Sequence, residues 1–202
     1  MKYLTTKEKI IYEALTLFSI KGYESVSVRD ISRSVGIKES SLYNHFKNKQ
    51  DIFDTIISIC EERANKMYSN LNIIDTFNGD FTFFEGIAQD QLLNITKASF
   101  EFYVVDNYMS KFRKVLTIEQ YNNQRIGDLF RDMFIEQPVN FQTQLFSRLM
   151  DIGQLKKSDP KATAMEFYAP IFMLLYQYDS INEEVNEILQ KHISNFSLKN
   201  SV

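Results

Sequence analysis

The chain has 202 residues, 44% of them hydrophobic and 24% charged, with 6 Gly and 3 Pro. This composition is typical of globular proteins and excludes the disordered and collagen-like classes. The single cysteine, Cys60, cannot form an intrachain disulfide, and its place on an apolar helical stripe indicates a core thiol. Because the two histidines also lie far apart, we expect a reducing compartment, no metal and no cofactor.

Two further features of the sequence concern location and partners. Lys and Glu interrupt the first twenty residues, and the apolar stretch over residues 168–176 is far shorter than the ~20 residues of a membrane helix. We therefore expect a cytoplasmic protein with no membrane partner. The net charge is −3, yet residues 1–50 hold nine Lys and Arg against five Asp and Glu, a local charge of +4. This asymmetry suggests a polyanionic partner for the N-terminal part alone.

The N-terminal part is expected to form three closely spaced helices. Apolar residues at helical spacing predict a first helix over residues 6–21, which Gly22 stops. Ser27, followed three residues later by Asp30, resembles a capping box and predicts the start of a second helix. A third helix is expected over residues 39–46, after a turn that contains glycine.

The second and third of these helices have the arrangement of a helix-turn-helix unit, whose second helix can enter a major groove about 12 Å wide. Leu42 and Phe46 lie four residues apart and are expected to face the core. Ser40, Ser41 and Asn44 can then reach base edges, and the side chains that can reach phosphates are Tyr43, His45, Lys47 and Lys49. Short helices joined by a Gly turn also occur in plain helical bundles, so spacing alone leaves that alternative open.

The rest of the chain also has helical periodicity. Asn48 and Asp51 predict the start of a long helix. Thr82 with Glu85 predicts a second capping box, which starts a helix over residues 83–105. Because this helix is apolar on several faces, we expect it to be buried. Further helices are expected over residues 107–116, 122–136, 138–152, 160–178 and 182–196. With no alternating strand pattern, the sequence predicts an all-α protein of about nine helices.

The N-terminal residues resemble the signature of the TetR family of bacterial transcriptional regulators. The matching segments are Val26-Ser27-Val28-Arg29-Asp30-Ile31-Ser32, Gly36-Ile37-Lys38, Leu42-Tyr43-Asn44-His45-Phe46 and Lys47-Asn48-Lys49, within a resemblance that covers residues 6 to about 57. It implies a helix-turn-helix DNA-binding domain over residues 1–47 and a helical-bundle body for ligand binding and dimerisation over residues 48–202.

The resemblance also implies roles for individual residues of the DNA-binding domain. Ser40, Ser41 and Asn44 are expected to read bases, and Tyr43, His45 and Lys49 to hold the DNA backbone. Further contacts are expected from Ser27, Arg29 and Lys38. Ser40 stands where many members have Gly, so the operator sequence cannot be transferred from the family.

A sensor of this kind needs a pocket, and the resemblance implies one in the body. Aromatic residues are concentrated over residues 77–178, and aromatic side chains with a few polar groups also line ligand pockets. We expect a small, mostly apolar effector near Phe102, Tyr103, Tyr108, Phe134 and Phe141. Polar side chains that could orient it are Asn94, Gln124 and Gln144.

The end of the chain carries two apolar stripes that no later element follows. Their members are Tyr168, Ile171, Phe172 and Leu175, then Val185, Leu189, Ile193 and Phe196. A homodimer through these stripes would match the two-fold symmetry of a palindromic operator in double-stranded DNA.

We therefore expect a repressor that a small effector releases from its operator. An activator or a co-repressor-dependent regulator with the same DNA-binding domain remains an alternative. An enzyme that uses the aromatic cavity is a further alternative. The sequence argues against it, because it contains no cluster of acids, bases or nucleophiles.

Overall fold

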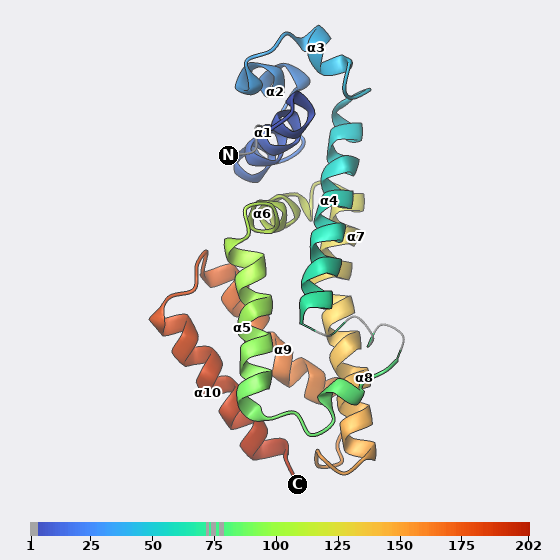
Figure 1. Ribbon diagram of the computed structural model, residues 1–202, viewed down its shortest axis with the longest axis vertical. Helices are drawn as coiled ribbons and strands as arrows, with labels where there is room; N and C mark the ends of the chain where they lie inside the picture. The colour runs from blue at the N-terminus through green and yellow to red at the C-terminus, as the bar shows by residue number, and fades with distance from the viewer. Residues whose placement is uncertain (1–3, 72, 74–75, 77–78) are drawn as a thin grey trace. The chain divides into compact units, whose positions relative to one another are not determined.

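The computed structural model describes residues 4–71, 73, 76 and 79–202, and it has the expected all-α fold (Figure 1). The described residues contain no β-strand, only an isolated antiparallel bridge between Leu155 and Ser201. The α-helices are α1 (Thr6–Lys21), α2 (Val28–Val35), α3 (Glu39–Tyr43), α4 (Lys49–Asn70), α5 (Gln89–Val105), α6 (Met109–Glu119), α7 (Gln124–Arg131), α8 (Gln137–Asp151), α9 (Pro160–Gln177) and α10 (Glu183–Asn200). A 3₁₀ turn, η2 (Thr82–Phe84), precedes α5, and a π-helical turn, η3 (Asp132–Glu136), joins α7 to α8.

The chain divides into two compact units. Unit 1 comprises Met1–Ala64 and Asn107–Phe130, and unit 2 comprises Asn65–Asp106 and Arg131–Val202. The DNA-binding domain expected over residues 1–47 lies in unit 1, which also holds the first part of α4, all of α6 and most of α7. Helix α4 therefore contributes residues to both units.

Aromatic rings from three helices form the core of unit 1. Phe18 of α1, Phe53 of α4 and Phe112 of α6 are fully buried. The ring of Phe53 lies 6.1 Å from that of Phe18 and 6.4 Å from that of Phe112, measured between centroids. These long-range contacts hold α1 against α4 and α6.

Local capping explains why α2 follows the sequence prediction. The Ser27 side chain accepts a hydrogen bond from the Asp30 N–H, and the Asp30 carboxylate accepts one from the Ser27 N–H, which completes the predicted capping box. Gly36 ends the helix at φ 77°, in the left-handed region that favours glycine. Both ends of α2 are thus determined by residues next to it in sequence.

Helix α3 is shorter than expected, with five residues in place of 39–46. The N–H groups of His45 and Phe46 both donate to the carbonyl of Leu42, which tightens the last turn and ends the helix. Asn48 then caps α4 by accepting a hydrogen bond from the Asp51 N–H at 2.9 Å. Leu42 and Phe46 are buried as predicted, at 0% and 3% exposure.

The capping box predicted from Thr82 and Glu85 is wrong. Asp80 accepts hydrogen bonds from both the N–H and the hydroxyl of Thr82, so Thr82 begins only the short turn η2. Glu85 instead pairs with Arg148 of α8 at 2.7 Å. Helix α5 starts at Gln89 and is less buried than expected, with Thr96, Phe100 and Val104 as its buried residues.

Helices α5, α8, α9 and α10 form the body of unit 2, where α8 packs on α9 and α10 packs on α5. Phe146, Phe167 and Phe196 meet in its core, with ring centroids 4.9–5.5 Å apart. Helix α9 begins at Pro160, where the Asp159 side chain accepts from the Ala162 N–H, and α10 begins where the Asn182 side chain accepts from the Val185 N–H.

Candidate nucleic-acid interface and ligand cavity

Helices α2 and α3 present most of the expected DNA-binding side chains to solvent. The exposed residues of this set are Ser27, Arg29, Lys38, Ser40, Tyr43, Asn44 and His45, and Ser41 and Lys49 are half-buried. Leu42 of α3 and Phe46, which follows the helix, are buried, and the exposed side chains between Lys38 and His45 include hydroxyl and amide groups. Such groups can donate to and accept from base edges in a major groove.

Two of the expected contacts are engaged within the protein. The Ser27 hydroxyl takes part in the capping box. The hydroxyl and the N–H of Ser27 both donate to the Asp30 carboxylate and lower the pKa of this carboxyl, and the hydroxyl has the larger effect. Arg29 lies 3.9 Å from the Glu39 carboxylate, across α2 and α3, with both side chains largely exposed. An exposed pair of this kind is weak, so Arg29 remains available for a phosphate.

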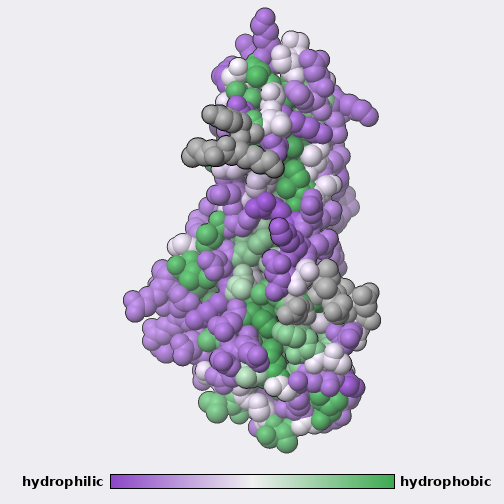
Figure 2. All heavy atoms as spheres, viewed as in Figure 1, coloured by the Kyte–Doolittle hydropathy of each residue, from purple (hydrophilic) through white to green (hydrophobic). Residues whose placement is uncertain are grey.

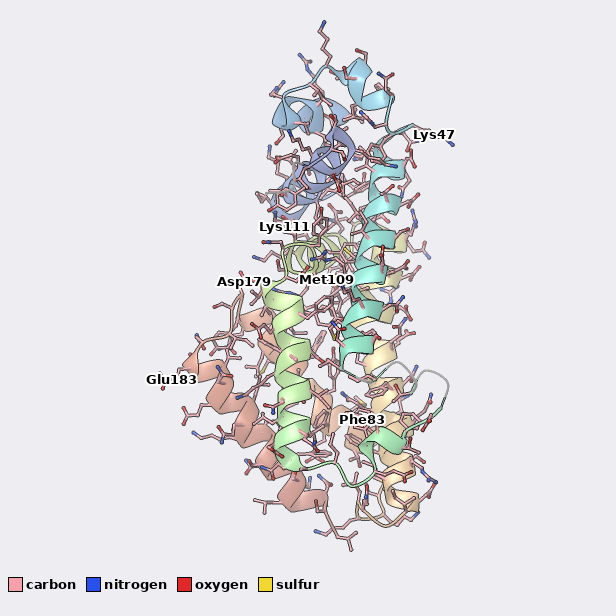
Figure 3. All side chains as sticks on the ribbon, viewed as in Figure 1. Lys47, Phe83, Met109, Lys111, Asp179 and Glu183 are labelled. Carbon is pink, nitrogen blue, oxygen red and sulfur yellow. The ribbon has the colours of Figure 1, made fainter. Side chains whose placement is uncertain are left out.

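The two lysines that follow α3 have different surroundings. The Lys49 ammonium donates to the carbonyls of Tyr23 at 2.8 Å and Glu24 at 3.4 Å, and lies 4.2 Å from the centre of the Tyr23 ring. Lys47 is exposed, and its side chain extends away from the ribbon (Figure 3). Lys49 thus anchors the segment after α1, while Lys47 presents its charge to solvent.

Unit 2 contains a partly open, mostly apolar cavity of about 150 Å³. Its wall comes from the end of α4, η2, η3 and helices α5, α8 and α9. Three of the five residues expected near a ligand line it, namely Tyr103, Phe134 and Phe141. Phe102 lies outside the wall with its ring edge-on to Tyr103, and Tyr108 belongs to unit 1, where it packs on Tyr12.

The described residues that line the cavity include no Asp, Glu, Lys, Arg or His. The hydroxyl oxygens of Tyr68 and Tyr103 lie 3.1 Å apart, and the Tyr168 hydroxyl donates to the carbonyl of Phe134 at 2.9 Å. Burial raises the pKa of all three tyrosines, so each hydroxyl stays protonated at neutral pH. The cavity wall is therefore electrically neutral.

One polar residue of the wall was missed by the sequence interpretation. Gln142 is only 9% exposed, and its Oε1 accepts no hydrogen bond within the described part of the chain. The residues considered for orienting a ligand, Asn94, Gln124 and Gln144, are all exposed. Helical spacing would have indicated that Gln142 is buried, since it shares its helical face with the buried Leu145, Phe146 and Leu149.

The apolar stripe expected as a dimer surface on α10 is buried inside the chain. Val185, Leu189, Ile193 and Phe196 are 0–5% exposed, because α5 and α9 pack against α10. Ile171 and Leu175 of α9 are buried too and line the cavity with Tyr168, while Phe172 is half-buried. The expectation of an apolar surface for dimerisation was therefore wrong for the α10 stripe and for Ile171 and Leu175.

Other apolar side chains of α9 reach the surface. Met165, Met173 and Tyr176 are 45–59% exposed and lie at spacings close to whole helical turns. The visible surface over α10 is mostly hydrophilic (Figure 2). We call Met165, Met173 and Tyr176 the α9 stripe.

Two other kinds of site are absent from the described residues. In that part of the chain no group of three or more His, Cys, Asp or Glu side chains could hold a metal ion, and no helix is long and apolar enough to cross a membrane. Cys60 is fully buried and not in a disulfide.

Comparisons with known proteins give the family of the N-terminal segment. Residues 10–56 match the family described as Bacterial regulatory proteins, tetR family. The biofilm operon icaADBC HTH-type negative transcriptional regulator IcaR of Staphylococcus aureus is 44% identical over 61 residues, 30% of this chain and 33% of that protein. The match thus spans about a third of the length of this curated relative. These findings confirm the resemblance inferred from the sequence.

Solved structures extend the similarity of fold to the whole chain. A TetR-family transcriptional regulator from Mesorhizobium loti superposes with a TM-score of 0.66 at 17% identity, over 98% of this chain and 97% of the other. The ketosteroid transcriptional regulator KstR2 of Mycobacterium tuberculosis gives 0.65 at 16% identity, over 100% and 97%. At such identities the likeness concerns the fold alone.

Proposed function

We propose that this chain, whose residues 10–56 belong to the tetR family, is a transcriptional repressor that a small apolar effector releases from double-stranded DNA. The observation that carries this proposal is the set of exposed hydroxyl and amide side chains of Ser40, Tyr43 and Asn44 beside the buried Leu42 and Phe46. The relative IcaR is described as a negative regulator, which favours repression over activation.

In this proposal two groups of side chains in unit 1 contact different parts of the DNA. Ser40, Ser41 and Asn44 read base edges, because hydroxyl and amide groups can both donate and accept hydrogen bonds. Side chains that hold the phosphate backbone are Arg29, Lys38, Tyr43, His45 and Lys47. Lys47 replaces Lys49 in this role, since the Lys49 ammonium is bound to backbone carbonyls.

The cavity of unit 2 is the proposed effector site. The course of helix α4 supports a coupling between the effector site and the DNA-binding surface. This helix carries the core residues Ile52 and Ile56 of unit 1 and the cavity residue Tyr68 of unit 2. An effector that favours the non-binding state with a coupling of ~1 to 3 kcal/mol lowers DNA affinity about 5- to 150-fold, and DNA lowers effector affinity by the same factor.

We also propose that the protein binds DNA as a homodimer. A two-fold dimer would place two copies of α3 on two half-sites of a palindrome. The α9 stripe is the surface we assign to this contact, because its three large side chains are 45–59% exposed in the single chain.

Selection of bound sequences from a random pool of double-stranded DNA tests the proposal. We expect enrichment of an inverted repeat whose half-sites are centred about 10 base pairs or a multiple apart. In Asn44→Ala, preference should relax at one position per half-site, at a loss of ~1 to 3 kcal/mol on the enriched sequence. A pool that remains unenriched after several rounds would contradict sequence-specific binding.

A further inference from the structure

We infer that the effector is a neutral molecule about the size of a single aromatic ring, and that its one hydrogen-bond donor binds the Gln142 amide. This inference rests on the proposed role of the cavity as the effector site. It goes further by naming the class of ligand and the residue that selects it.

Cavity size and lining limit the apolar part of the ligand. The volume of about 150 Å³ equals that of an apolar cavity that stays dry and binds benzene. Phe84, Phe100, Phe134 and Phe141 contribute rings to the wall. Aromatic rings prefer edge-to-face and offset contacts with such neighbours, which favours an aromatic ligand.

The wall also limits the charge of the ligand. An ion that enters a site without an opposite charge loses its hydration and gains no partner. The described lining residues supply no ionised side chain, and their tyrosines remain protonated. Carboxylates, phosphates and amines in their charged forms are therefore disfavoured.

Gln142 supplies the directional contact. A buried acceptor without a donor is an unfavourable feature of a folded protein, and its penalty is removed when a donor arrives. The Gln142 Oε1 is such an acceptor, on a residue of the cavity wall. Because the terminal torsion of a glutamine side chain is broad, a small rotation can turn this oxygen toward a hydroxyl or N–H in the cavity.

The other polar groups of the wall with known partners are already committed. The Thr96 hydroxyl donates to the carbonyl of Leu92, and the Tyr168 hydroxyl donates to that of Phe134. The Gln137 amide nitrogen donates to the Asp132 carboxylate at 2.7 Å. These bonds commit the donors of Thr96, Tyr168 and Gln137, whereas the Gln142 Oε1 is a buried acceptor that no donor in the described part of the chain satisfies.

Phenol and toluene are matched probes, because they differ in a hydroxyl against a methyl group on the same ring. We would measure the dissociation constants of both by calorimetry for the wild-type protein and for Gln142→Met, which keeps a side chain of similar length without the amide. The ratio of phenol affinity to toluene affinity should fall about tenfold in Gln142→Met, equivalent to about 1.4 kcal/mol. Comparing ratios cancels the different hydration of the two probes.

Gln137→Met is the matched control, because Gln137 lies on the same helix and lines the same cavity but has a partner. Its phenol-to-toluene ratio should equal that of the wild type. An unchanged ratio in Gln142→Met would overturn the inference, and so would failure of both probes to bind the folded wild-type protein. Failure of the proposed function is distinguishable, since it appears as absent DNA binding in the selection experiment whatever the probes do.

Discussion

Gly22 illustrates how one residue connects distant parts of unit 1. Its φ of 82° lies in the region that favours glycine, and a Cβ there would lie 2.3 Å from Oε1 of Glu119. Glu119 is 2% exposed, and the same oxygen accepts a hydrogen bond from the Glu24 N–H at 3.3 Å. The sequence predicted that Gly22 ends a helix, but it contained no signal for this close approach.

We therefore expect Gly22→Ala to lower the free energy of unfolding by about 3 kcal/mol, since it adds a steric conflict with a buried carboxylate to backbone strain. Gly36→Ala is the control, because Gly36 has a similar φ of 77° but a Cβ there would meet no neighbouring atom within 4 Å. Its loss should be about 1 kcal/mol. Urea denaturation measures both values, and equal losses would show that the Glu119 contact contributes nothing.

The two lysines after α3 should respond differently to removal of their charge. Lys47→Ala should weaken binding to all DNA sequences alike and reduce the salt slope by about one, with unchanged thermal stability. Lys49→Ala should instead destabilise unit 1 by about 1 kcal/mol, because it removes hydrogen bonds to Tyr23 and Glu24. DNA titrations at several salt concentrations and thermal melts check both variants. A salt slope changed only in Lys49→Ala would reverse the assignment.

At the scale of elements, prediction succeeded where the determining residues are close in sequence. Helix α2 is bounded by Ser27 and Gly36, and the start of α10 is fixed by Asn182, whose side chain accepts from the Val185 N–H. It failed at Thr82, because the Thr82 N–H donates to Asp80 instead of Glu85, and the Glu85 N–H donates to the Thr82 carbonyl instead of its hydroxyl. It also failed for the stripe of α10, since apolar periodicity identifies a buried face but not the helix that covers it.

The α9 stripe carries the prediction for dimerisation. Met173→Glu should place a charge in the proposed interface and weaken the dimer at least about tenfold, because an unpaired charge at an apolar contact must lose its hydration. Sedimentation at micromolar concentration measures the mass. Leu189→Glu cannot serve this purpose, because Leu189 is fully buried and the variant would unfold unit 2.

Tyr121→Glu is the control for Met173→Glu, since Tyr121 is 90% exposed and lies in unit 1, away from α9 in the chain. It should leave the mass unchanged. A dimer that survives Met173→Glu at nanomolar concentration would exclude the α9 stripe as the interface.

At the scale of the whole molecule, the sequence predicted the fold and the position of the DNA-binding segment better than it predicted the cavity. The motif of residues 26–49 lies in one continuous stretch, so its pattern is visible in the sequence. The cavity wall is assembled from six separate elements between Tyr68 and Leu175. Which aromatic residues face the cavity depends on how these elements pack, and the sequence does not show this packing. Phe102 and Tyr108 were therefore wrongly expected in the cavity wall.

Helices α2 and α3 are proposed to bind a specific DNA sequence. The most direct measurement is the association constant for the enriched duplex and for a shuffled duplex of the same composition, over a range of salt concentrations. We predict that the enriched duplex binds at least about 10³-fold more tightly, and that the logarithm of both constants falls linearly with the logarithm of salt concentration. Equal affinity for the two duplexes, or affinity independent of salt, would contradict the account.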